Sequence, residues 1–162
     1  MTDRRIVGID PGLATTGYGV VTVRGSSIEL VEGGTIRPLD RRAPLEQRLA
    51  AIFGDVADLL REVKPEVVAI EDLYTRYERP RTAILMGHAR GVIALAAGQA
   101  GIPVQTFTAS QVKRALTGEG HASKAQVQRA VAEVLGLRKL PEPADVADAL
   151  AIALTCANAR RG

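Results

Sequence analysis

Aromatic residues and cysteine are scarce in this sequence of 162 residues. Phe, Tyr and Trp make up 3% of the chain and Trp is absent, so the core must consist mainly of Val, Ile, Leu and Ala. The single cysteine, Cys156, excludes an intramolecular disulfide and argues against a secreted, cross-linked protein. Only His88 and His121 offer nitrogen ligands and no Cys/His cluster exists, which argues against a zinc site.

Long apolar runs are also missing. The most apolar stretch, residues 91–104, is too short to span a bilayer and contains Pro103. The polar N-terminus leads directly into an expected strand and shows no signal peptide. We therefore expect a soluble, cytoplasmic protein with no membrane partner. The net charge of +3 is compatible with a nucleic-acid partner but does not establish one.

The order of expected strands and helices indicates one α/β domain over residues 1–162. Residues 4–10, 17–23 and 27–36 have the composition of an antiparallel meander, whereas 67–71 and 103–107 are short apolar strands that each follow a helical pattern. Helices are expected at about 45–63, 81–100, 110–116, 123–135 and 144–159. This order predicts a five-stranded mixed sheet, with three antiparallel and two parallel strands and helices on both faces.

Two carboxylates end the apolar strands at 4–10 and 67–71. Asp10 closes the first and Glu71 the fourth of the expected strands. Right-handed connections allow these two strands to lie side by side, which would make the acids neighbours. The alternative is that each acid simply ends its strand and faces solvent, as most charged residues do.

Asp145 and Asp148 add two more acids at the start of the last helix. A spacing of three places both on one helical face, although acids in a first turn are also favoured by the helix dipole alone. The small residues around Asp148 suggest that it faces inward. Four converging carboxylates would need a cation, and oxygen ligands select Mg²⁺ or Mn²⁺. Two such ions per site would suit phosphodiester hydrolysis.

Several motifs together resemble the RuvC family of crossover (Holliday) junction endodeoxyribonucleases. They are Gly-Ile-Asp-Pro-Gly at 8–12, Thr-Gly-Tyr-Gly at 16–19, Ile-Glu at 70–71, Gly-His-Ala-Arg-Gly-Val at 87–92, Gln-Val-Lys at 111–113, the stretch 118–128 and Ala-Asp-Val-Ala-Asp-Ala-Leu-Ala at 144–151. The resemblance covers nearly the whole chain. It implies a ribonuclease H-like fold, a homodimer, and metal binding by Asp10, Glu71, Asp145 and Asp148.

The same resemblance implies a reaction and partners. Family members make paired symmetric nicks in opposed strands of four-way DNA junctions, leaving 5′-phosphate and 3′-hydroxyl ends, in recombination and repair. They act with the branch-migration proteins RuvA and RuvB and prefer certain short sequences at the cut.

Candidate DNA contacts lie in two groups. The first follows Glu71 directly and contains Tyr74, Arg76, Tyr77, Arg79 and Arg81. Basic side chains bind phosphates and exposed aromatic rings stack on unpaired bases, although a solvated loop has the same composition. In the resemblance, Tyr74 occupies the aromatic position at the junction centre.

The second basic group contains Lys113, Arg114, Lys124 and Arg129. Ordinary helix-surface side chains would explain these residues equally well. The resemblance implies instead that Lys113 and Lys124 take part in phosphate binding and catalysis.

Small residues at Ala83, Gly87 and Gly91 recur every fourth position of the expected helix 81–100. Such a stripe permits another helix to approach closely. It would pack either on its own sheet or against a second protomer, and the family resemblance favours the second.

Three other functions are compatible with parts of the sequence. A single-domain relative of the actin and sugar-kinase phosphate-binding proteins would share the first motif, as would a YqgF-like RNA nuclease. A junction-binding protein without catalytic activity would share the fold, but all four acids are present here.

Overall fold

The computed structural model describes residues 2–37, 40–72 and 79–159, and its centre is a five-stranded sheet. The strands are β1 (Arg4–Asp10), β2 (Thr16–Arg24), β3 (Ser27–Ile36), β4 (Val67–Glu71) and β5 (Val104–Phe107). Their order across the sheet is β3-β2-β1-β4-β5. β2 pairs antiparallel with β1 and β3, whereas β4 lies parallel to β1 and β5 parallel to β4. The predicted ribonuclease H-like mixed sheet is thus confirmed.

Continuous apolar sequence in β1 and β4 follows from their central place in the sheet. Ile6, Val7 and Ile9 are fully buried, because helices cover both faces. Ile9 pairs with Ile70 in the parallel register. The next residues, Asp10 and Glu71, therefore end adjacent strands at the same edge.

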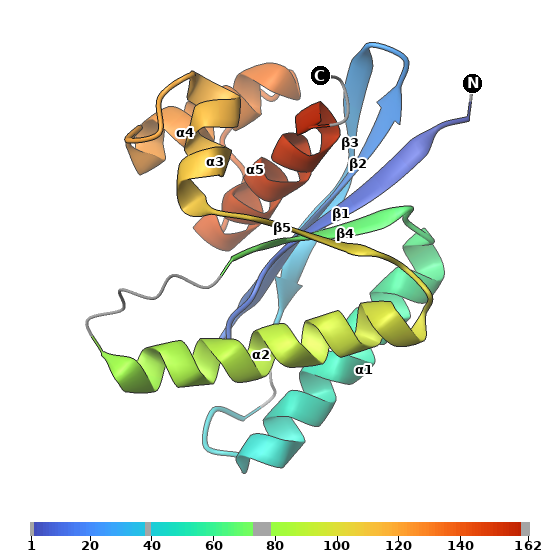
Figure 1. The fold of residues 1–162 in the computed structure, drawn as a ribbon, viewed down its shortest axis with the longest axis vertical. Helices are drawn as coiled ribbons and strands as arrows, with labels where there is room; N and C mark the ends of the chain where they lie inside the picture. Colours follow the sequence, from blue (N-terminus) through green and yellow to red (C-terminus); the bar gives the residue numbers. More distant parts are fainter. Residues whose placement is uncertain (1, 38–39, 73–78, 160–162) are drawn as a thin grey trace.

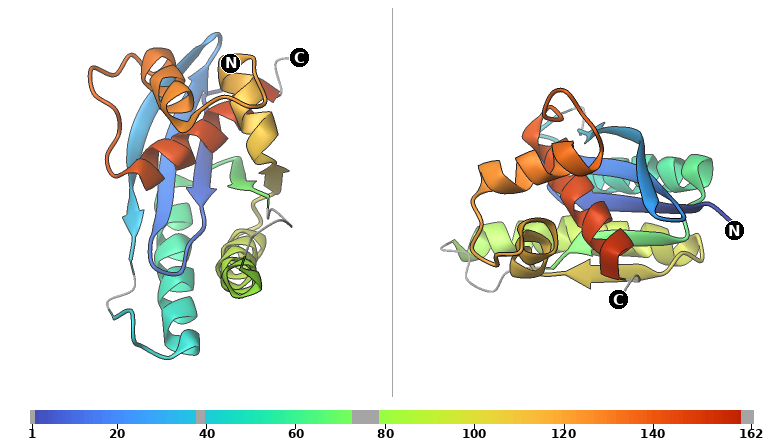
Figure 2. Two further views of the ribbon diagram at one scale, coloured as in Figure 1. Left: turned by 90° about the vertical axis from the view of Figure 1, so that its left-hand side faces the viewer. Right: turned by 90° about the horizontal axis from the view of Figure 1, so that it is seen from above.

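In the described part of the chain, helices form one layer on each face of the sheet (Figure 1). α1 (Leu45–Val63) and α2 (Pro80–Gln99) cover one face, packing on Val7, Ile9 and Val20 among others. α3 (Ala109–Thr117), α4 (Lys124–Val134) and α5 (Ala144–Ala159) lie on the other face (Figure 2). Among the helices in the described part of the chain, none has the length and apolarity needed to cross a membrane.

Two glycines let α5 lie directly on the sheet. A Cβ added to Gly8 of β1 would overlap the carbonyl oxygen of Ala149 and come within 2.7 Å of the backbone nitrogen of Ala153. A Cβ on Gly17 of β2 would overlap the carbonyl oxygen of Asp145. Because glycine has no side chain, α5 can pack directly on these strands. Its two aspartates therefore lie near the ends of β1 and β4.

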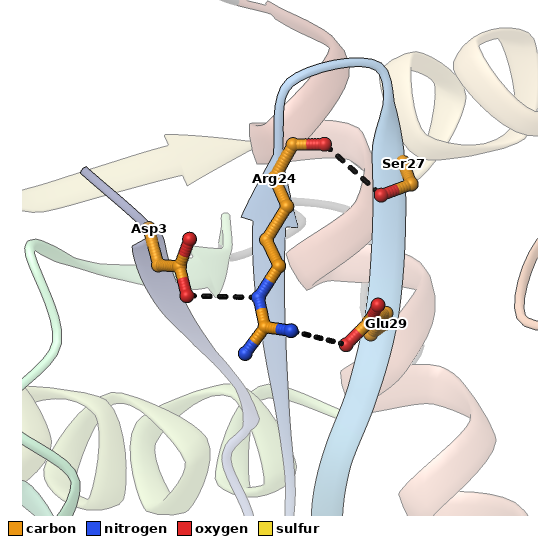
Figure 3. Close-up of polar contacts among 4 residues, drawn as sticks. All are labelled: Asp3, Arg24, Ser27 and Glu29. Carbon is orange, nitrogen blue, oxygen red and sulfur yellow. Dashed lines mark hydrogen bonds and ion pairs between the residues drawn. The ribbon is translucent and has the colours of Figure 1, made fainter. Parts of the chain in front are cut away.

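Surface ion pairs stabilise the end of the sheet where β2 turns into β3 (Figure 3). Nε of Arg24 lies 2.8 Å from Oδ2 of Asp3, and Nη1 lies 3.4 Å from Oε2 of Glu29. Ser27 donates from Oγ to the carbonyl oxygen of Arg24 at 3.0 Å. All of these side chains are largely exposed, so each ion pair contributes about 0–1 kcal/mol.

Candidate active site

Four carboxylates gather where β1 and β4 end beneath the start of α5. Asp10 is the last residue of β1 and Glu71 the last of β4, while Asp145 and Asp148 lie in the first turns of α5. All four side chains are half-buried. The arrangement that the strand order and helix spacing predicted is the one that the structure has.

The acids repel one another through their charges. Burial is the main cause that raises the pKa of Asp10 from 3.8 to about 7, followed by repulsion from Asp148, Glu71 and Asp145, while Lys124 acts in the opposite direction. Burial and then Asp148 also raise the pKa of Glu71, against the effect of Lys113 and Lys124. Pairs of carboxylates whose ionisation is suppressed in this way are typical of functional sites.

A tight turn supports Asp10. Thr16 is fully buried and its hydroxyl donates to the carbonyl oxygen of Gly12 at 2.7 Å. The amide of Gly12 donates back to the Thr16 oxygen at 3.2 Å. These two hydrogen bonds close the connection between β1 and β2 and so hold the end of β1.

Two lysines supply the opposite charge. Nζ of Lys124 lies 3.3 Å from Oδ2 of Asp148. Lys113 and Lys124 both line a cleft of about 270 Å³ together with Glu71 and Asp148. Both lysines therefore lie in the same cleft as two of the acids.

Helix caps set the positions of both lysines. Thr108 begins α3 and Ser123 begins α4, and each forms a reciprocal capping box with the glutamine three residues later. Such caps define where a helix begins, because they satisfy the backbone N–H groups of its first turn. Lys124 is the first residue of α4, so the Ser123 cap directly determines where its side chain starts.

The carboxylates of this site are of the kind that binds a divalent cation, although their side chains do not converge on a single point. Within residues 2–37, 40–72 and 79–159, no three Asp, Glu, His or Cys side chains form a ready-made ligand group. The nearby acids are all carboxylates, however, and the pKa values of Asp10 and Glu71 are raised by burial and by the neighbouring negative charges. Oxygen donors with unrelieved negative charge suit hard cations such as Mg²⁺ or Mn²⁺.

The expected DNA contacts after Glu71 are only partly described. Tyr74, Arg76 and Tyr77 lie outside the described residues. Arg79 precedes the first turn of α2 and Arg81 lies in it, and both are exposed. Arg114 of the second basic group is exposed on α3.

The exposed face of α2 differs from the predicted small-residue stripe. Gly91 is exposed with open space around it, but Ala83 and Gly87 are half-buried. Ile84 and Leu95, with 62% and 53% of their surface exposed, are the large apolar residues of this face. They lie seven and four residues from Gly91, a spacing that places all three on one face of the helix.

Comparison with known proteins places the chain in a family. The family model described as crossover junction endodeoxyribonuclease RuvC matches residues 6–156. The RuvC proteins of Rhodopirellula baltica and Pelotomaculum thermopropionicum are 49% and 46% identical over 92% of this chain, covering 83% and 90% of their own lengths. The structure is similar to that of Thermus thermophilus RuvC in complex with a Holliday junction substrate, with a TM-score of 0.92, 39% identity, and coverage of 98% of this chain and 95% of the other. This chain belongs to the RuvC family of crossover junction endodeoxyribonucleases.

Proposed function

We propose that this protein is a Holliday junction resolvase, a metal-dependent endonuclease that nicks opposed strands of a four-way DNA junction. The observation that carries the proposal is the cleft in which Glu71 and Asp148 face Lys113 and Lys124, with Asp10 and Asp145 beside them. Carboxylates and lysines in one cleft combine what phosphodiester hydrolysis requires. The family match and the curated relatives favour this function over a YqgF-like RNA nuclease or an actin-type phosphate-binding protein.

The chain's own residues would orient the phosphodiester. Lys113 and Lys124 offer ammonium donors to the non-bridging phosphate oxygens. Lys124 now neutralises Asp148, so it must exchange partners when a phosphate and a cation enter. Asp10, Glu71, Asp145 and Asp148 would hold two Mg²⁺ or Mn²⁺ ions per site, with Asp10 the most strongly destabilised as a free anion. When bound, these ions lower the pKa of the attacking water and stabilise the leaving 3′ oxygen.

DNA beyond the cut would be held by basic and aromatic residues that follow Glu71 in the sequence and by a basic residue of α3. We assign this role to Arg79, Arg81 and Arg114, which are exposed, and to Tyr74, Arg76 and Tyr77. Binding by such side chains is sequence-independent and salt-dependent, because it rests on phosphate contacts and base stacking.

Cleavage of a synthetic four-way junction tests the function directly. We expect nicks in opposed arms with Mg²⁺ or Mn²⁺, little cutting of a linear duplex of the same sequence, and no product in EDTA, because the carboxylates alone cannot activate water. The products are resolved on a denaturing gel with each strand labelled separately. A junction that is bound but left intact with both metals would instead indicate a binding protein without nuclease activity.

Two such sites in a homodimer would explain paired nicks, and the apolar face of α2 is the surface that we propose for the dimer. Leu95→Asp is expected to yield a monomer, because a charge on this face would be buried in the proposed interface. Size-exclusion chromatography with light scattering measures the change. Val31→Asp is the matched control, since Val31 is 49% exposed on β3, away from α2. A dimer that survives Leu95→Asp would place the interface elsewhere.

Further partners follow from the same assignment. We propose that RuvA and RuvB deliver the junction, and that the reaction takes place in the cytoplasm on chromosomal DNA. We also propose that residues 1–162 act as a single nuclease domain.

A further inference from the structure

Arg90 of α2 reaches from the helix to the ends of β4 and β5. Its Nη2 donates to the hydroxyl oxygen of Thr106 at 3.0 Å, and the same atom lies 3.9 Å from Oδ1 of Asp72. Thr106 is on β5 and Asp72 directly follows Glu71. One guanidinium group thus contacts β5 and the residue that follows β4, directly next to the proposed metal ligand Glu71.

β4 and β5 are hydrogen-bonded at this point, but their pairing ends here. Ile70 pairs with Thr106 and Glu71 with Phe107, and the amide of Asp72 donates to the carbonyl oxygen of Phe107 at 2.7 Å. β5 ends at Phe107 and β4 at Glu71, so the ladder provides no further pairs to hold the Glu71 carboxylate. Side-chain contacts must supply the rest of its support.

Packing alone does not explain an arginine at position 90. Its side chain is 26% exposed, and Nε is buried without a hydrogen-bond partner among the described residues. Burying an N–H group in this way is unfavourable, and an apolar side chain of similar shape would avoid it. The cost is understandable if the guanidinium has a task at the site.

We propose that Arg90 is a positioning residue for the cleavage reaction: it joins α2 to the ends of β4 and β5 and thereby fixes the carboxylate of Glu71. The inference rests on the proposed resolvase function. It also gives α2 two roles, because Arg90 is adjacent in sequence to Gly91 of the proposed dimer face. The helix that would meet the partner protomer is thus the helix that supports the site.

The test compares Arg90→Met, Arg90→Lys and the control Arg61→Met, which removes an exposed pair with Asp58 on α1. Single-turnover cleavage of a four-way junction, junction affinity in EDTA and thermal unfolding are measured for each. We expect Arg90→Met to cleave at least about 10-fold more slowly, a loss comparable to that caused by removing the outer-shell support of a metal ligand. The junction Kd should stay within about twofold of wild type and the Tm should be unchanged or higher. Arg90→Lys should recover most of the rate, and Arg61→Met should match wild type.

Three results would overturn the proposal. One is a rate for Arg90→Met close to that of wild type. Another is a Kd that weakens in proportion to the rate, which would make Arg90 a DNA contact. The third applies if Arg90→Met does not fold: Thr106→Val, which removes the acceptor with little change of shape, should then slow cleavage several-fold, and an unchanged rate contradicts the proposal. Failure of the resolvase function itself is distinguishable, because wild type would then not cleave.

Discussion

Replacing Asp10 with asparagine is expected to abolish junction cleavage and at the same time to stabilise the protein. Asp10 lies at the centre of the acidic group, because Asp148, Glu71 and Asp145 all act on its pKa. Asparagine keeps the shape but cannot supply an anionic ligand, so the cleavage rate should fall by about 1000-fold or more, which corresponds to ~4 kcal/mol of transition-state stabilisation. Junction affinity should be retained, since Lys113 and Lys124, which we propose bind the phosphate, are untouched. Single-turnover cleavage and a binding titration measure the two effects.

The gain in stability has a defined pH dependence. Asp10 has a pKa of about 7 in the folded protein against 3.8 for an unperturbed carboxyl group, so the folded state binds the proton more tightly than the unfolded state. The free energy of unfolding without metal should therefore decrease as pH rises from about 4 to about 7 and change little above that range. The pKa of Glu71 is raised too and acts in the same direction.

Thermal unfolding in EDTA across this pH range checks the sign. Asp10→Asn should lie above wild type at neutral pH and show a flatter profile, and each kcal/mol gained should raise Tm by roughly 2–4 °C. Asp55→Asn on α1 is a suitable control, because Asp55 is exposed and distant from the site. A variant that cleaves like wild type, or a wild-type Tm that rises from acidic to neutral pH, would refute this account of Asp10.

The sheet and the acidic site could be predicted because their signals are local. Continuous apolar runs that end in Asp10 and Glu71 indicate central strands, and the handedness rule makes them neighbours. In the observed register Ile9 lies opposite Ile70. This register aligns the buried apolar residues of β1 with those of β4. The spacing of Asp145 and Asp148 places both on one face of α5, which contributes the remaining two acids of the site.

The remaining features depend on contacts between distant elements. A helix beginning at about residue 123 was predicted, but the ion pair of Lys124 with Asp148 joins residues 24 positions apart. The hydrogen bond from Arg90 to Thr106 depends on how α2 crosses β5. Which large side chains of α2 face outward also depends on such contacts, because the packing of Ala89 and Ile93 on the sheet leaves Ile84 and Leu95 exposed.

Gly8→Ala should have the largest effect on stability, although it adds one methyl group. The new Cβ would overlap the carbonyl oxygen of Ala149, and backbone atoms of α5 cannot move aside as a flexible side chain can. We expect a loss of about 3 kcal/mol or more in the free energy of unfolding, a large value for a single substitution. Urea unfolding followed by circular dichroism measures it.

Gly54→Ala is the matched control for this effect, because a Cβ there would meet nothing within 4 Å in the middle of α1. It should stabilise the protein by about 1 kcal/mol through helix propensity. If Gly8→Ala is tolerated like Gly54→Ala, α5 does not lie as close to β1 as we describe.

If Gly8→Ala folds at low temperature, its cleavage should still be impaired while junction binding persists. α5 carries two of the four acids, so the displacement that relieves the overlap also moves Asp145 and Asp148 away from Asp10 and Glu71.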